Sequence, residues 1–157
     1  MNDSEFIRAI EDCTLPAAEF THTAHVRLGY LYLCSGSFAQ AIERTSCTIR
    51  RYATSLGAPQ KYHETITVAY LALIHERLAE NGDGGGWEGF ADANADLFDR
   101  GLLLRSYRAV QLDSELARRV FVLPRADVTS SRASQTRGGP RQSISSSGSR
   151  SPPGSTQ

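Results

Sequence analysis

Apolar residues recur at helical spacing along most of the chain. In residues 62–80 they fall every three or four positions and would form one stripe on a helix: Ile66, Ala69, Tyr70, Leu73, Ile74 and Leu78. Residues 38–56 repeat this spacing behind Ser37, a residue type that caps helix N-termini, and Gly57 and Pro59 follow where a helix would end. Alternating patterns of strand length are nearly absent, so the chain predicts an all-α fold.

Shorter segments complete the predicted bundle. A first helix is expected through residue 12, with Asp3 or Ser4 as its cap, and a second helix over residues 21–34. After a glycine-rich turn, short helices are expected at 89–98 and 102–110, then a last turn capped by Ser114 and an extended segment at 121–124. The whole is a compact bundle of about five to six helices.

Composition divides the chain after residue 127. Residues 128–157 contain ten serines, seven glycines and prolines, four arginines and no acidic residue. Such a segment cannot bury enough apolar area to offset the entropy of ordering, so a disordered C-terminal tail is expected. The abrupt change also fits a frameshifted or read-through end of the coding sequence. Residues 1–127 are expected to form the single helical domain.

Charge and cysteine content narrow the function classes. Residues 1–127 carry 17 acidic and 13 basic residues, an excess that argues against a broad nucleic-acid-binding surface. The chain lacks both an apolar run of the ~18 residues that a membrane span needs and the features of a signal peptide. The three cysteines show no CxxC spacing, which favours a reducing compartment. A cytoplasmic protein without nucleic-acid or membrane partners is expected, and the oligomeric state stays open.

Three of the four histidines lie in two short motifs, Phe-Thr-His-Thr-Ala-His at 20–25 and Tyr-His-Glu-Thr-Ile-Thr at 62–67. His22 and His25 are three positions apart, which makes them neighbours on a helix, and His63 could join them if the two helices begin side by side. Two or three imidazoles plus a carboxylate suit a divalent transition metal (Zn, Fe, Mn or Ni) with an open position for water or substrate.

One hypothesis from these residues is a metal site that acts on a small molecule. In it His22, His25 and His63 are ligands, Glu64 is a fourth ligand or a base, and Tyr62 donates a proton or orients the substrate. Two alternatives use the same residues without a metal. The histidines could act as general acids and bases, or they could cap helices in a non-catalytic binding or regulatory module. Spacing alone favours the structural alternative, and it does not separate acid–base chemistry from metal binding.

The two motifs, in this order, resemble those of a family of small, all-helical bacterial proteins, largely without assigned function, that carry an F-x-H-x-x-H segment and a later Y-H-x-T-x-T segment. The resemblance covers about residues 5–124 and leaves out the tail. It implies site positions at the three motif histidines, surrounded by Tyr62, Thr65 and Thr67, and it implies no particular reaction.

Overall fold

The structure, a computed structural model, describes residues 1–125, so the predicted tail at 128–157 lies outside the described residues. These residues form seven α-helices: α1 (Asp3–Glu11), α2 (His22–Cys34), α3 (Phe38–Ser55), α4 (Glu64–Asn81), α5 (Trp87–Ala93), α6 (Ala109–Leu112) and α7 (Glu115–Arg119). Three 3₁₀ helices join them: η1 (Pro59–Lys61), η2 (Ala95–Phe98) and η3 (Leu102–Arg105). Residues 1–125 contain no β-strand, which confirms the predicted all-α fold class.

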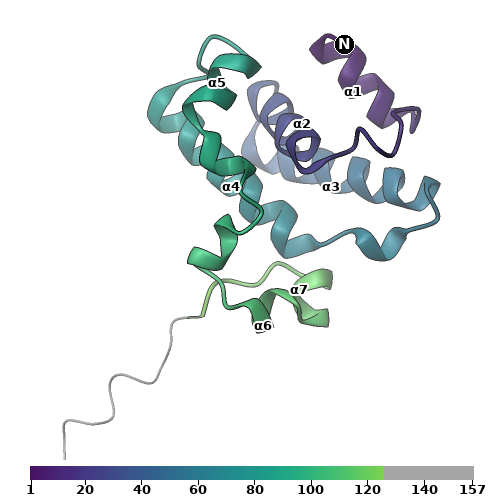
Figure 1. The fold of residues 1–157 in the computed structure, drawn as a ribbon, viewed down its shortest axis with the longest axis vertical. Helices are drawn as coiled ribbons and strands as arrows, with labels where there is room; N and C mark the ends of the chain where they lie inside the picture. The colour runs from purple at the N-terminus through teal and green to yellow at the C-terminus, as the bar shows by residue number, and fades with distance from the viewer. Residues whose placement is uncertain (126–157) are drawn as a thin grey trace, which may run out of the picture. The chain divides into compact units, whose positions relative to one another are not determined.

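The three long helices α2, α3 and α4 pack against one another and hold the centre of the bundle (Figure 1). α1 lies on α3, α5 and η2 lie on α2, and α7 lies on α4, with α6 and α7 at the opposite end of the molecule from α1 and α5. Large side chains from the three long helices are almost completely buried: Leu28, Tyr32, Tyr52, Leu71 and Ile74. Burial of this apolar surface is the main force that holds the bundle together.

Local capping residues set the helix starts. Thr21 accepts a hydrogen bond from the backbone N–H of Ala24, and Ser37 forms a capping box with Gln40. α1 begins near the predicted position, but its cap is Asn2 instead of Asp3 or Ser4, because the Asn2 side chain and Glu5 form a reciprocal capping box. α4 begins two residues later than predicted, since the side chain of His63 is itself the cap.

The predicted helix at 89–98 is broken in two at Asn94. The buried Asn94 amide donates to the carbonyl of Phe90 and accepts from Arg77 of α4, and its backbone leaves the helical region with φ −128°. α5 therefore ends at Ala93 and η2 follows. The predicted helix at 102–110 is likewise divided into η3 and α6.

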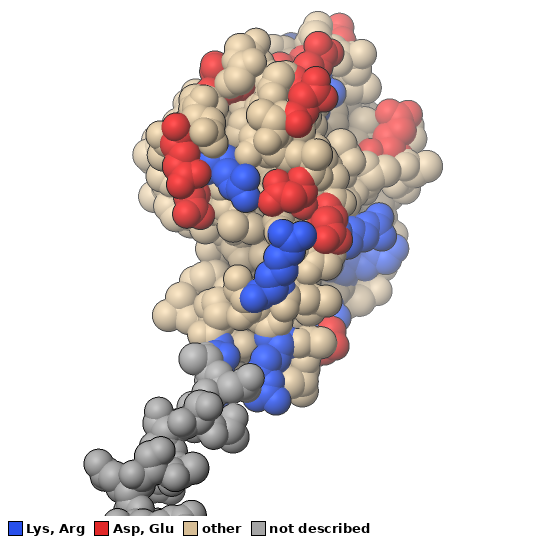
Figure 2. Space-filling model, turned by 60° about the vertical axis from the view of Figure 1, so that its left-hand side comes forward, with Lys and Arg blue, Asp and Glu red and all other residues tan. Residues whose placement is uncertain are grey.

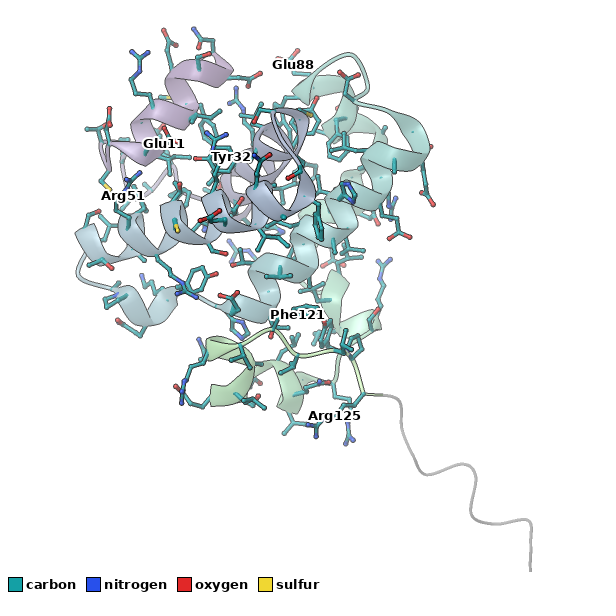
Figure 3. The ribbon with its side chains drawn as sticks, turned by 180° about the vertical axis from the view of Figure 1, so that it is seen from behind. Glu11, Tyr32, Arg51, Glu88, Phe121 and Arg125 are labelled. Carbon is teal, nitrogen blue, oxygen red and sulfur yellow. The ribbon has the colours of Figure 1, made fainter. Side chains whose placement is uncertain are left out.

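A polar cluster ties α1 to the central helices. The Tyr32 hydroxyl donates to the Glu11 carboxylate over 2.8 Å and lies 3.1 Å from the Thr48 hydroxyl (Figure 3). The guanidinium of Arg44 sits 4.1 Å above the Tyr32 ring. Burial, with the adjacent Glu11 carboxylate, raises the pKa of Tyr32 to about 12, so the hydroxyl stays protonated and keeps donating.

The C-terminal part of the described chain covers the first turn of α4. The hydroxyl of Thr65, which is fully buried, donates to the carbonyl of Val120 and accepts from the backbone N–H of Val122. The Tyr107 hydroxyl donates to the carbonyl of Val122. Residues 121–125 form neither helix nor strand, and these three hydrogen bonds hold the start of that segment in place.

Charges of the two signs are partly separated on the surface. On the face drawn in Figure 2, acidic side chains gather over the upper part and basic side chains over the middle and lower parts. None of the helices within residues 1–125 combines the length and apolar character that crossing a membrane requires.

Candidate functional site

A pocket of about 530 Å³ between α2, α3 and α4 takes in side chains from both histidine motifs. His22 and His25 reach it from the first turn of α2, and Tyr62 and His63 reach it from the residues just before α4. These four residues come together because α2 and α4 pack against each other and each motif lies at the start of its helix. Glu64 is not among the residues that line the pocket.

Each of the three imidazoles hydrogen-bonds a backbone carbonyl oxygen. The distances are 3.0 Å from His22 Nε2 to Leu97, 2.6 Å from His25 Nδ1 to Thr21 and 2.8 Å from His63 Nε2 to Leu112. A carbonyl oxygen only accepts, so the bonded nitrogen carries the proton in each ring. The neutral tautomer is therefore Nε2–H in His22 and His63, and Nδ1–H in His25.

His63 uses both of its ring nitrogens for structure. Its Nδ1 accepts the backbone N–H of Ile66 over 3.3 Å and caps α4, while its Nε2–H holds the carbonyl of Leu112 in α6. The side chain is buried, with 8% of its surface exposed. Metal binding through either nitrogen would leave a backbone group without its hydrogen bond.

His25 keeps one nitrogen free. Its Nε2 has no partner among the described residues, and its ring lies 4.0 Å from the ring of Phe20. Burial lowers the pKa of His25 below its ordinary value of 6.5, and the nearby charges of His22 and Arg100 lower it further, against the opposing effect of the bond to Thr21. The imidazole is therefore neutral near pH ~7, with an unprotonated Nε2.

The predicted metal centre receives no support from this arrangement. His22 and His25 each keep a nitrogen free, but within residues 1–125 no group of three or more His, Cys, Asp or Glu side chains is placed to hold a metal ion. Most protein sites for Zn and related metals use three or four protein ligands. A divalent metal held by His22, His25 and His63 stays a prediction from the sequence.

Glu64 and Tyr62, the predicted catalytic pair, form a cluster with Arg50. The Glu64 carboxylate lies 2.6 Å from the Arg50 guanidinium and accepts the Tyr62 hydroxyl over 2.8 Å. The same guanidinium sits 4.4 Å above the Tyr62 ring. Burial raises the pKa of Tyr62, so its proton stays on the hydroxyl and is directed at Glu64. The geometry thus favours a structural role for this pair, and the catalytic roles remain predictions.

Three further residues line the pocket that the sequence did not single out. Thr45 is 2% exposed and its hydroxyl has no hydrogen-bond partner within the described residues. It falls on the apolar stripe of α3, and a polar residue at such a position could have been recognised from the sequence as a candidate site residue. Lys61, the only lysine of the chain, directly precedes the second histidine motif. Arg100 gave no signal, because only the tertiary fold brings it to the pocket.

Comparisons with models of protein families, with curated proteins and with solved structures found no match. The resemblance to a family of small helical bacterial proteins therefore stays an expectation. The function of this chain has to be inferred from the chemistry of the pocket.

Proposed function

We propose that the protein binds a small organic molecule in this pocket and that His25 accepts a proton from it or from a water molecule beside it. The observation that carries the proposal is the 2.6 Å hydrogen bond between His25 Nδ1 and the Thr21 carbonyl. It orients the ring and leaves Nε2 as a free acceptor, which is the form that a general base needs.

The electrostatic setting of His25 supports the same role. A base must be unprotonated to act, and burial keeps the pKa of His25 below its ordinary value. The pocket that it lines has a volume of about 530 Å³. Pockets for small ligands commonly measure about 300–1,000 Å³ and combine apolar walls with a few polar groups.

The proposal requires no metal. His22 and His25 could each offer one nitrogen to an ion, whereas His63 is committed to hydrogen bonds with Ile66 and Leu112. A general base needs only a free imidazole nitrogen and a bound substrate within hydrogen-bond reach. Activity that persists in a chelator would therefore separate this mechanism from the metal mechanism that the sequence predicts.

Hydrolysis of nitrophenyl acetate, an activated ester small enough for the pocket, tests His25 as a proton acceptor. We expect the full-length protein to accelerate hydrolysis and His25→Gln to lose that acceleration, because general-base catalysis contributes about 10²–10⁴-fold. The matched control is His75→Gln, since His75 is exposed, stacks on Phe38 and does not line the pocket. EDTA is expected to leave the rate unchanged.

The pH profile gives a second readout. The rate should rise with an apparent pKa below 6.5, the ordinary value of His25, because burial lowers it. A rate that His25→Gln leaves intact, or one that EDTA abolishes and Zn²⁺ restores, would contradict the proposal.

A second candidate is a binding site without chemistry. His63 favours it, because both of its nitrogens serve packing and capping. In that case wild type and His25→Gln would bind the same ligand, and neither would accelerate ester hydrolysis.

A further inference from the structure

The lining side chains that can carry a charge near neutral pH are all basic, because burial raises the pKa of the two lining phenols, Tyr62 and Tyr70. Besides the three histidines these basic side chains are Lys61 and Arg100, and none of the described residues that form the lining is Asp or Glu. A lining without carboxylates is unexpected here, because acidic residues outnumber basic ones by 17 to 13 in residues 1–127. A concave site that gathers cations and excludes carboxylates attracts anionic ligands.

The two permanent cations have no acidic partner in the described structure. The ion pairs within residues 1–125 occupy five other arginines: Arg27, Arg44, Arg50, Arg77 and Arg105. The Lys61 ammonium and the Arg100 guanidinium form neither an ion pair nor a hydrogen bond with any described residue. Arg100 lies close enough to His25 for its charge to act on that imidazole, so it belongs to the histidine end of the pocket.

Farther along α2 and α4 the lining becomes apolar. Gly29, Leu71 and Ile74 lie one to three turns beyond the histidine motifs on these helices. A Cβ on Gly29 would stand 3.0 Å from Leu71 and 3.2 Å from Ile74, so glycine is what allows this close approach of the helices. The pocket therefore has a basic end at the first turns and an apolar end deeper in the bundle.

The Thr45 hydroxyl is an independent sign that the pocket receives a polar atom. It is buried, lines the pocket and makes no hydrogen bond with any described residue. Buried hydroxyls are normally satisfied, and an orphan in a cavity calls for a partner that occupies the cavity. A ligand with a polar group as well as an apolar body would supply that partner.

We infer that the ligand is an organic acid, whose apolar body lies against Leu71 and Ile74 and whose anionic group binds Lys61 and Arg100. This inference rests on the proposed small-molecule site and adds the class of ligand. The ammonium and guanidinium supply charge-assisted hydrogen bonds, which are stronger than neutral ones. An anion bound beside His25 would also favour its protonated form, and would make it a stronger base in the complex than in the free protein.

Two fluorescent probes with the same ring system test the charge preference: anilinonaphthalene sulfonate and the uncharged phenylnaphthylamine. We expect the full-length protein to bind the sulfonate about tenfold more tightly, a ratio in the range that two partly exposed charge contacts supply. The ratio should shrink as salt rises, because ions screen exposed charges. The double variant Lys61→Gln/Arg100→Gln should abolish the preference and leave phenylnaphthylamine binding unchanged.

The control variant Arg8→Gln/Arg125→Gln removes the same charge from exposed positions outside the pocket and should keep the preference. Equal affinity of the wild type for both probes would overturn the inferred ligand class and leave the small-molecule site standing. A preference that survives in the Lys61/Arg100 variant would overturn the inference as well. If neither probe binds, both the inferred ligand class and the proposed small-molecule site are contradicted. The ester assay with His25→Gln tests the proton acceptor separately.

Discussion

The unpaired hydroxyl of Thr45 makes a prediction about a single residue. Thr45→Val replaces the hydroxyl with a methyl group of similar shape and removes an orphan polar atom from the core. Because a buried unsatisfied group costs about 1–3 kcal/mol, we expect the free energy of unfolding to rise by about 1 kcal/mol. Urea denaturation of the full-length protein, without added ligand, measures the change.

Thr48 provides the matched control on the same helix. Its hydroxyl is also buried, but it lies 3.1 Å from the Tyr32 hydroxyl and is satisfied. Thr48→Val should therefore lower the free energy of unfolding by about 1 kcal/mol. If Thr45→Val destabilises the protein as much as Thr48→Val does, the Thr45 hydroxyl has a partner, such as a bound water, in the unliganded protein.

At the level of single residues, the sequence predicted the location of the site more accurately than the roles of its side chains. The spacing of His22 and His25 follows from helix geometry, so their proximity could be expected from the sequence. The role of His63 could not, because its partner Leu112 is 49 residues away. Glu64 was predicted to be a ligand or base because it is adjacent to His63 in the sequence. The ion pair that its carboxylate forms with Arg50 could not be predicted from the sequence.

At the level of elements, Thr65 joins α4 to the end of the described chain. Thr65→Val would leave the carbonyl of Val120 and the N–H of Val122 without their hydrogen bonds. We expect the free energy of unfolding to fall by about 1–2 kcal/mol, since both hydrogen bonds are partly buried and an intramolecular hydrogen bond contributes about 0.5–1.5 kcal/mol. Hydrogen exchange should show lost protection at the Val122 amide, while amides in α2 and α3 are affected only through global stability.

Thr65→Ser is the control for this prediction, because it keeps the hydroxyl and removes only a methyl group. It should cost about 1 kcal/mol, the value of a buried methylene-sized group, and preserve the protection of Val122. Equal effects of the valine and serine variants would mean that the hydroxyl does not hold the segment.

Three helix starts were predictable from local caps, although the local cap of α1 is Asn2 and not the predicted Asp3 or Ser4. Thr21, Ser37 and Ser114 each cap a helix that begins at the next residue, and each is a residue type with a known capping preference. The start of α4 was not predictable to the residue, since histidine is a rarer cap whose ring is fixed from the far side by Leu112. The break at Asn94 depends on Arg77 of another helix, a contact that a local pattern does not reveal.

At the scale of the molecule, the pocket is a product of packing. Its walls come from α2, α3 and α4, and its two cations come from η1 and from the link between η2 and η3. The sequence predicted that helices would form and where two motifs would lie on them. It could not place Arg100 beside His25, because these residues are brought together only by the folded bundle.

Burial of His25 also couples the stability of the whole molecule to pH. Its pKa in the folded protein lies below 6.5, its ordinary value, so below that pH the unfolded chain takes up a proton that the folded chain does not. Folding stability from this group is therefore complete above pH ~6.5 and is lost as the pH falls toward the folded pKa. His25→Gln cannot titrate, and its free energy of unfolding should depend less steeply on pH in this window than that of the wild type.

Urea denaturation of both full-length proteins at several pH values between ~5 and ~8 isolates this contribution as the difference between the two curves. Contributions from groups that the substitution leaves unchanged cancel in that difference. A wild-type curve parallel to that of His25→Gln would mean that His25 has the same proton affinity in the folded and unfolded states. The lowered pKa on which the proposed chemistry depends would then be absent.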